Sequence, residues 1–96
     1  MKLVLSPAAK RDLKEISVYT LKQWGIEQAD RYTYQLENAL KTAAENPYLG
    51  AAFTDIRHGY RKIIVETHRV YYRVENDSVT IIRILHQSRD SGPLIQ

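Results

Sequence analysis

The chain has 96 residues, 44% of them hydrophobic and 26% charged, which predicts one folded globular domain over residues 1–96 and excludes a largely disordered chain. The absence of cysteine excludes disulfides, thiolate catalysis and cysteine-based zinc sites. The net charge of +3 lies entirely in residues 57–96, which hold seven basic and four acidic residues, whereas residues 1–56 hold seven of each.

A short β-prone run at residues 2–5 precedes the first predicted helix. Ser6 is suited to cap the helix and Pro7 to occupy its first position, while Gly25 ends it. One face carries an apolar stripe at helical spacing, made up of Leu13, Ile16, Thr20 and Trp24. On the polar face Arg11 and Glu15 are four residues apart, so they can form an ion pair.

A second helix follows almost at once and ends at Asn46 and Pro47. Its apolar face consists of Ala29, Tyr32, Leu36, Ala39, Leu40 and Ala43. The turn between the two helices is so short that we expect an antiparallel hairpin that packs against a sheet. The connection over residues 46–59 is longer than usual, and we expect it to be pinned to the body by its apolar side chains, namely Tyr48, Leu49, Phe53 and Ile56.

Three β-rich runs, at residues 60–65, 69–74 and 79–85, predict an antiparallel meander. The short turn at residues 75–78 is expected to set the register of the last hairpin. The fold class is therefore α+β: an N-terminal strand, a helical hairpin and a three-stranded meander packed on the helices. Residues 87–96 have no periodic pattern and are expected to be extended or flexible.

Strict alternation along the middle strand of the meander places Arg69, Tyr71 and Arg73 on an outward face and Val70, Tyr72 and Val74 on the helix-packed face. In the last strand both faces are largely apolar, which indicates a central position in the sheet. There, alternation places Ile81, Arg83 and Leu85 on one face and Ile82, Ile84 and His86 on the other. Arg83 is costly to bury alone, so it is either paired with an acid or directed into a groove.

Six of the seven basic residues in the second part of the chain are arginine, which is suited to bidentate contacts with carboxylates and phosphates. This favours an acidic or phosphate-bearing partner, and the alternative is a solvated basic sheet face. His86, at the end of the last strand, could serve in acid–base chemistry or be structural. The three histidines lack metal-ligand spacing and no hydrolase motif occurs, so neither a metal nor another cofactor is expected.

Landmarks in a fixed order resemble the ParE toxins of the RelE/ParE superfamily over residues 3–90. They are Leu5-Ser6-Pro7-Ala8-Ala9, Asp12-Leu13, Ile16, Tyr19-Thr20, Trp24-Gly25, Gln28-Ala29, Tyr32, Glu45-Asn46-Pro47, Leu49-Gly50, Arg57 to Lys62, His68, Val70, Tyr72-Arg73-Val74, Ile82 to His86 and Arg89-Asp90. The resemblance implies a toxin of a bacterial type II toxin–antitoxin pair that poisons DNA gyrase. It also implies a ParD-like antitoxin whose C-terminal segment wraps over the toxin, and such a segment suits the apolar grooves between helices and sheet.

The alternative is the RelE-like branch, whose members cleave mRNA on the ribosome without a metal. Arg69 and His86 are similar to positions where those nucleases carry a phosphate-binding arginine and a general acid. Gln87 stands where such enzymes often have an aromatic hydroxyl, and no lysine occurs between Lys41 and Lys62. These gaps leave charge stabilisation and proton transfer under-supplied. No catalytic residue is therefore predicted outside this alternative.

A third hypothesis, from another class, is a DNA- or antitoxin-binding repression module. The charge of +3 without a recognition-helix pattern argues against sequence-specific nucleic acid binding. The residues predicted to bind the antitoxin or the target are Arg61, Arg69, Arg73, Arg83, His86 and Arg89. No stretch approaches the length of a membrane span and no signal-peptide core is present, so a cytoplasmic location without membrane contact is expected.

Overall fold

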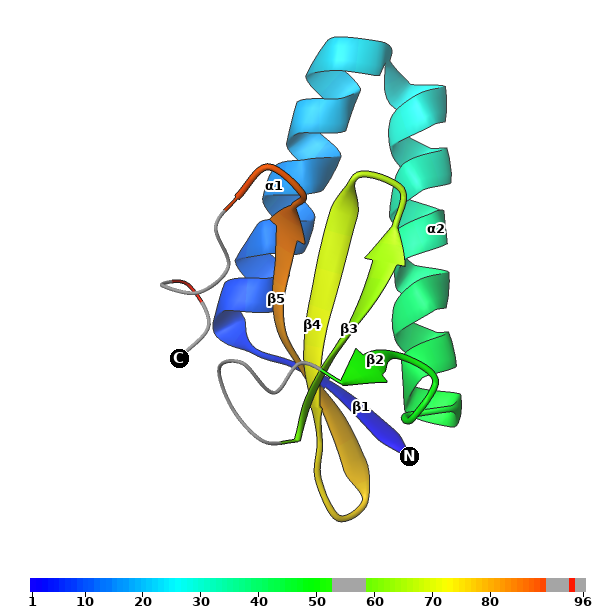
Figure 1. Cartoon of the computed structure of the whole chain (residues 1–96). Helices are drawn as coiled ribbons and strands as arrows, with labels where there is room; N and C mark the ends of the chain where they lie inside the picture. Colours follow the sequence, from blue (N-terminus) through cyan, green and yellow to red (C-terminus); the bar gives the residue numbers. More distant parts are fainter. Residues whose placement is uncertain (53–58, 90–93, 95–96) are drawn as a thin grey trace.

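The computed structural model describes residues 1–52, 59–89 and 94, and Figure 1 shows a helical hairpin lying against one face of a β-sheet. In chain order the elements are β1 (Lys2–Leu5), α1 (Pro7–Trp24), α2 (Ile26–Glu45), β2 (Ala51–Ala52), β3 (Tyr60–Val65), β4 (His68–Val74) and β5 (Ser78–His86). The predicted α+β fold and its meander are confirmed. In the described part of the chain, no helix has the length and apolar character needed to cross a membrane.

The sheet has five strands in the order β1-β5-β4-β3-β2, so the predicted central position of β5 is confirmed. β1 pairs with β5 in parallel, through Lys2 opposite Ser78 to Leu5 opposite Ile81. All other neighbours are antiparallel. β2 was not predicted, because two alanines after a glycine carry little β-propensity.

The start of α1 also secures the middle of β5. Ser6 Oγ accepts the Ala9 amide at 2.9 Å, as an N-cap should, and donates its own hydrogen to Ile82 O at 2.7 Å. The Ser6 amide donates to Ile81 O at 2.9 Å. Ser6 therefore binds two consecutive carbonyls of β5, at the point where Ile82 has no partner in β4. Such an extra residue in one strand is a β-bulge.

The main core lies between the helices and the sheet. Leu36 and Leu40 of α2 pack with Val70, Tyr72 and Ile81 of the sheet, all of them at most 2% exposed. The predicted stripe of α2 is therefore confirmed, whereas that of α1 is only partly correct. Its last member, Trp24, is 72% exposed, because the end of the helical hairpin extends beyond the sheet (Figure 1).

A tyrosine hydroxyl pins the start of the connection after α2. Tyr72 Oη donates to Pro47 O at 2.7 Å and accepts the Gly50 amide at 3.1 Å. Tyr48 and Leu49 are exposed, contrary to the prediction. The other two predicted anchors, Phe53 and Ile56, lie outside the described residues.

A second, smaller apolar cluster covers the sheet face away from the helices. Tyr60, Tyr71 and Leu85 are buried there, with Ile82 and Leu94 packed against them. Tyr71 therefore shares a face with Arg69 and Arg73, as predicted. Its side chain is nevertheless buried, because Tyr71 is only 1% exposed. Leu94 shows that part of the predicted flexible tail contacts the body, and residues 90–93 and 95–96 of that tail lie outside the described residues.

Candidate functional site

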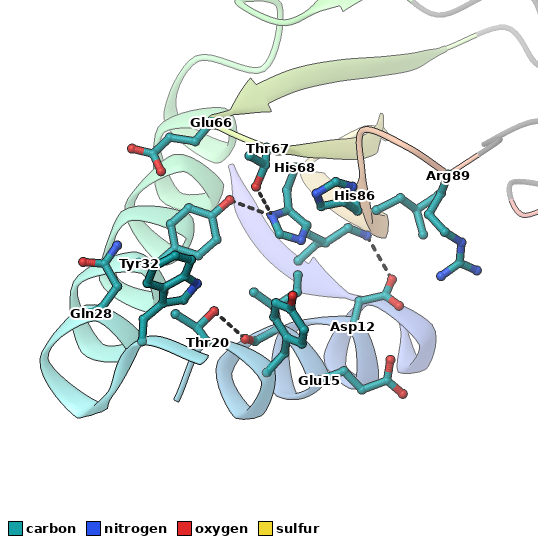
Figure 2. Close-up of a pocket in the computed structure, with 15 residues that line it drawn as sticks. Asp12, Glu15, Thr20, Gln28, Tyr32, Glu66, Thr67, His68, His86 and Arg89 are labelled. Carbon is teal, nitrogen blue, oxygen red and sulfur yellow. Dashed lines mark hydrogen bonds between the residues drawn. The ribbon is translucent and has the colours of Figure 1, made fainter. Parts of the chain in front are cut away.

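A groove of about 800 Å³ opens between the helical hairpin and the edge of the sheet formed by the β3–β4 turn and the end of β5. The helices contribute four apolar or aromatic side chains to it, Ile16, Tyr19, Trp24 and Tyr32, and four polar ones, Asp12, Glu15, Thr20 and Gln28. The sheet side contributes Thr67, His68, His86 and Arg89. Figure 2 shows the residues that line the groove, with Tyr32, Thr67, His68, His86 and Arg89 among those labelled. The sheet side also contributes the acid Glu66 and the apolar Ile84 and Leu85, so both walls combine polar and apolar side chains.

His68 and Tyr32 form the polar floor of the groove. Tyr32 Oη donates to Val65 O at 3.0 Å and lies 2.6 Å from His68 Nδ1 (Figure 2). Since the hydroxyl hydrogen is used by Val65, the Nδ1–H of His68 is the donor in the second bond. Thr67 Oγ1 also lies near this nitrogen, at 3.3 Å. Burial raises the pKa of Tyr32 above its ordinary value of 10.0.

The second imidazole, that of His86, stands edge-on to His68 with ring centroids 5.4 Å apart. Burial first, and then the charge of His86, lower the pKa of His68 below 6.5, while Asp12 opposes this shift. His86 Nδ1 accepts the Ser88 amide at 3.1 Å and lies 2.8 Å from Ser88 Oγ. Neutral His86 therefore carries its proton on Nε2.

The bulge at Ile82 is what brings the two histidines together. Before it, Val74 pairs with Val79 and Tyr72 with Ile81, in the register that the turn predicts. After it the register shifts by one residue, so His68 pairs with His86. The predicted alternation is wrong beyond Ile82, because Ile84 packs into the core beneath the helices and Leu85 into the opposite cluster. A one-residue slip exchanges the two faces of a strand.

Arg83 is paired with an acid, one of the two alternatives that the sequence left open. Its Nε and Nη2 atoms donate to Asp12 at 2.8 and 2.9 Å. Asp12 Oδ2 also accepts the Ile84 amide at 3.0 Å, beyond the end of β1. The hydrogen bond to Asp12 raises the pKa of Arg83 above its ordinary value. The guanidinium is committed to this contact, and its predicted role in binding stays a prediction.

Two other arginines also have partners within the chain. Arg61 Nη1 donates to Gly50 O at 2.8 Å, and its guanidinium lies 4.9 Å from the centre of the Tyr48 ring. Arg73 pairs with Glu75 at 2.7 Å, and this carboxylate raises the pKa of Arg73. Neither arginine lines the groove.

Arg69 projects from the face opposite the groove, the same face as Tyr71, because side chains alternate along β4. Over the described residues no hydrogen bond or ion pair involves its side chain. Of the six predicted binding residues, only His86 and Arg89 line the groove. The six residues are thus distributed over separate surfaces and do not form one basic face.

Sequence reasoning missed His68 and Tyr32 as site residues. Both were landmarks of the resemblance, but Tyr32 was otherwise only a member of the apolar stripe of α2, and His68 fell between the strands predicted at residues 60–65 and 69–74. The available signal was that a histidine begins one strand of the hairpin and another ends its neighbour. Among residues 1–52, 59–89 and 94, no group of three or more side chains of the types His, Cys, Asp and Glu could hold a metal ion.

Comparison with known proteins places this chain among the toxins of toxin–antitoxin systems. A chain from the chromosomal ParDE TA system of P. aeruginosa superposes with a TM-score of 0.78 at 23% identity, covering 90% of this chain and 95% of that one. Residues 3–91 match the family described as ParE toxin of type II toxin-antitoxin system, parDE. The chain therefore belongs to the ParE toxin family.

Two curated relatives agree with this assignment. Toxin ParE1 of Mycobacterium tuberculosis is 42% identical over 88 residues, which is 91% of this chain and 90% of the relative. Toxin ParE1 of Caulobacter vibrioides is 41% identical over 87 residues, with the same coverage of both chains.

Proposed function

We propose that this ParE toxin poisons DNA gyrase and that a ParD-like antitoxin keeps it inactive by filling the groove. The family supplies the class of protein, a toxin of a type II toxin–antitoxin system. Gyrase is the target that the resemblance to ParE toxins implies. Because gyrase acts on chromosomal DNA, the proposal places the toxin in the cytoplasm.

The chemistry of the groove supports an antitoxin segment as its occupant. Its helical wall contains aromatic and aliphatic side chains beside polar ones, and Trp24 and Tyr19 are 72% and 64% exposed at its rim. The opposite wall offers His86 and Arg89, whose side chains can donate to carboxylates. An amphipathic segment with acidic residues would bury the first wall and pair with the second. Such segments bind helix–sheet grooves by folding on contact.

The observation that favours gyrase over mRNA is the separation of Arg69 from His86. Cleavage of a phosphodiester requires the phosphate-binding cation and the general acid to converge on one phosphate. Here His86 lies on the helix side of the sheet, whereas Arg69 projects from the opposite face. This arrangement supports a toxin that acts by binding, and we propose Arg69, His86 and Arg89 as residues that contact the antitoxin or the target. Arg61, Arg73 and Arg83 can contribute through the donors that their internal contacts leave free.

mRNA cleavage is the second candidate, and the cluster in the groove is the observation that favours it. Two imidazoles 5.4 Å apart and a phenol that contacts one of them could supply both an acid and a base. In that case His86 would act from the groove without Arg69, and Arg89 would be the nearest groove cation to hold the phosphate.

The test compares the two targets directly. Purified toxin is added to gyrase in a supercoiling and cleavage-complex assay, and in parallel to translating ribosomes with a defined mRNA, each with and without the antitoxin. Trapped gyrase–DNA breaks with intact mRNA, both relieved by the antitoxin, are the expected result. Cut mRNA with unaffected gyrase would overturn the proposal and assign the protein to the nuclease branch.

A further inference from the structure

A second depression, of about 460 Å³, lies along α1 beside the groove. We call it the outer α1 face; it is lined by Arg11, Lys14, Glu15, Val18, Tyr19 and Lys22. These residues recur every three or four positions, so they form one stripe along the helix. Apolar Val18 lies among three cations, Arg11, Lys14 and Lys22, while Glu15 and Tyr19 border the stripe on the side of the groove.

Nothing in the described part of the chain covers this stripe. Val18 is 41% and Tyr19 64% exposed. No ion pair involves Arg11, Lys14 or Lys22 within the described residues, since the only two pairs recorded there are Arg73–Glu75 and Arg83–Asp12. The predicted pair between Arg11 and Glu15 is therefore wrong. In the free toxin these apolar side chains stay exposed and these cations stay unpaired among the residues that the structure describes. A partner could therefore gain both hydrophobic burial and ion pairs on this surface.

The outer α1 face is continuous with the groove. Glu15 and Tyr19 line both depressions and so form the ridge between them. A segment that leaves the groove across Tyr19 reaches Val18 without crossing any other element.

We propose that the outer α1 face is a second docking surface, which takes an acidic amphipathic segment of the antitoxin. This inference rests on the proposed function, because that function supplies the antitoxin. The segment would place an apolar side chain on Val18 and Tyr19 and carboxylates near Lys14 and Lys22. The antitoxin would thereby hold α1 from two sides, in the groove and outside it.

The test is the affinity of purified full-length antitoxin for the variant Lys14→Glu/Lys22→Glu, measured by calorimetry. A matched control is Arg31→Glu/Lys41→Glu, which changes two exposed cations on α2 and alters the net charge by the same amount. The substitutions remove two attractive charges and add two repulsive ones, so we expect the first variant to bind about tenfold or more weakly. The control should bind within about threefold of the wild type, and the difference between the variants should shrink at high salt.

A second variant tests the apolar part of the stripe independently. Val18→Glu places a carboxylate at an exposed position outside the core. The circular dichroism spectrum and the melting temperature of this variant should therefore stay close to those of the wild type. The expected result is again a loss of about tenfold or more in antitoxin affinity. Failure of the antitoxin to bind even the wild-type toxin would instead contradict the proposed function.

Antitoxin affinities equal to that of the wild type in both the Lys14→Glu/Lys22→Glu and Val18→Glu variants would overturn this inference and leave the proposed function standing. Unchanged antitoxin binding together with lost gyrase poisoning would also overturn it, because the surface would then belong to the target. An equal loss of antitoxin affinity in the matched control would also count against the inference, because the effect would then come from general attraction between opposite net charges.

Discussion

Asp12 and Arg83 lie 71 residues apart in the sequence and form a bidentate ion pair, with Nε–Oδ2 at 2.8 Å and Nη2–Oδ1 at 2.9 Å. Asp12 is 7% exposed and also binds the Ile84 amide at 3.0 Å. β1 ends at Leu5, opposite Ile81, so this amide has no strand neighbour on that side. The Asp12 carboxylate takes the place of the missing strand and joins α1 to the edge of β5.

Asp12→Ala should therefore destabilise the fold far more than removal of a surface acid. It leaves the Ile84 amide without its acceptor and Arg83 without its counter-ion, in a site where the arginine side chain is 20% exposed. We expect a loss of about 3 kcal/mol in the free energy of unfolding, at the low end of what breaking a buried pair costs, because Arg83 can still reach solvent. Urea unfolding measures it.

Asp30→Ala, at an exposed position of α2, is the control and should stay within about 0.5 kcal/mol of the wild type. Equal stability of the two variants would contradict the role given to Asp12.

Gly50→Ala tests the anchor of the connection after α2. A Cβ at this position would lie 2.5 Å from Tyr72 Oη and 2.9 Å from Lys62 O. The tyrosine would have to move and lose its bonds to Pro47 and Gly50, which we expect to cost about 1–3 kcal/mol. A double-mutant cycle with Tyr72→Phe checks the cause. Without the hydroxyl the glycine substitution should cost less, and strictly additive losses would show that Tyr72 is not the obstacle.

His68 should make stability depend on pH below about 6.5. Its pKa is lowered in the folded protein, first by burial and then by His86, so at acidic pH the unfolded chain binds more protons than the native one. The stability contribution is complete above the unfolded pKa and is lost as the pH falls from there toward the folded pKa. His68→Gln should flatten this part of the profile in urea unfolding at pH 7.5 and pH 5.5, and an unchanged slope would mean that other groups dominate.

The elements were predictable from the sequence because capping and periodicity are local. Ser6, Pro7 and Gly25 mark the bounds of α1, and the three meander strands agree with the structure to within one residue at each end. The groove was harder to predict from the sequence, because its geometry depends on the bulge at Ile82. Isoleucine and leucine occupy both faces of β5, so no change in alternation reveals the slip that joins His68 to His86. The two bonds from Ser6 at this point join residues 75 and 76 positions apart, which no local pattern reveals.

Trp24 reports on the groove, because it is the only tryptophan in the chain and is 72% exposed. The sequence assigned it to the core stripe of α1, whereas the structure places it at the rim. Trp24→Ser should therefore change the free energy of unfolding by less than about 1 kcal/mol, since little of the ring is buried. The same variant should weaken antitoxin binding, because aromatic side chains at a groove rim are typical hot spots. In the wild type, binding should shift the tryptophan emission to shorter wavelength, with Trp24→Phe as the blank for any tryptophan of the antitoxin. Tight binding without an emission shift would place the antitoxin elsewhere on the toxin.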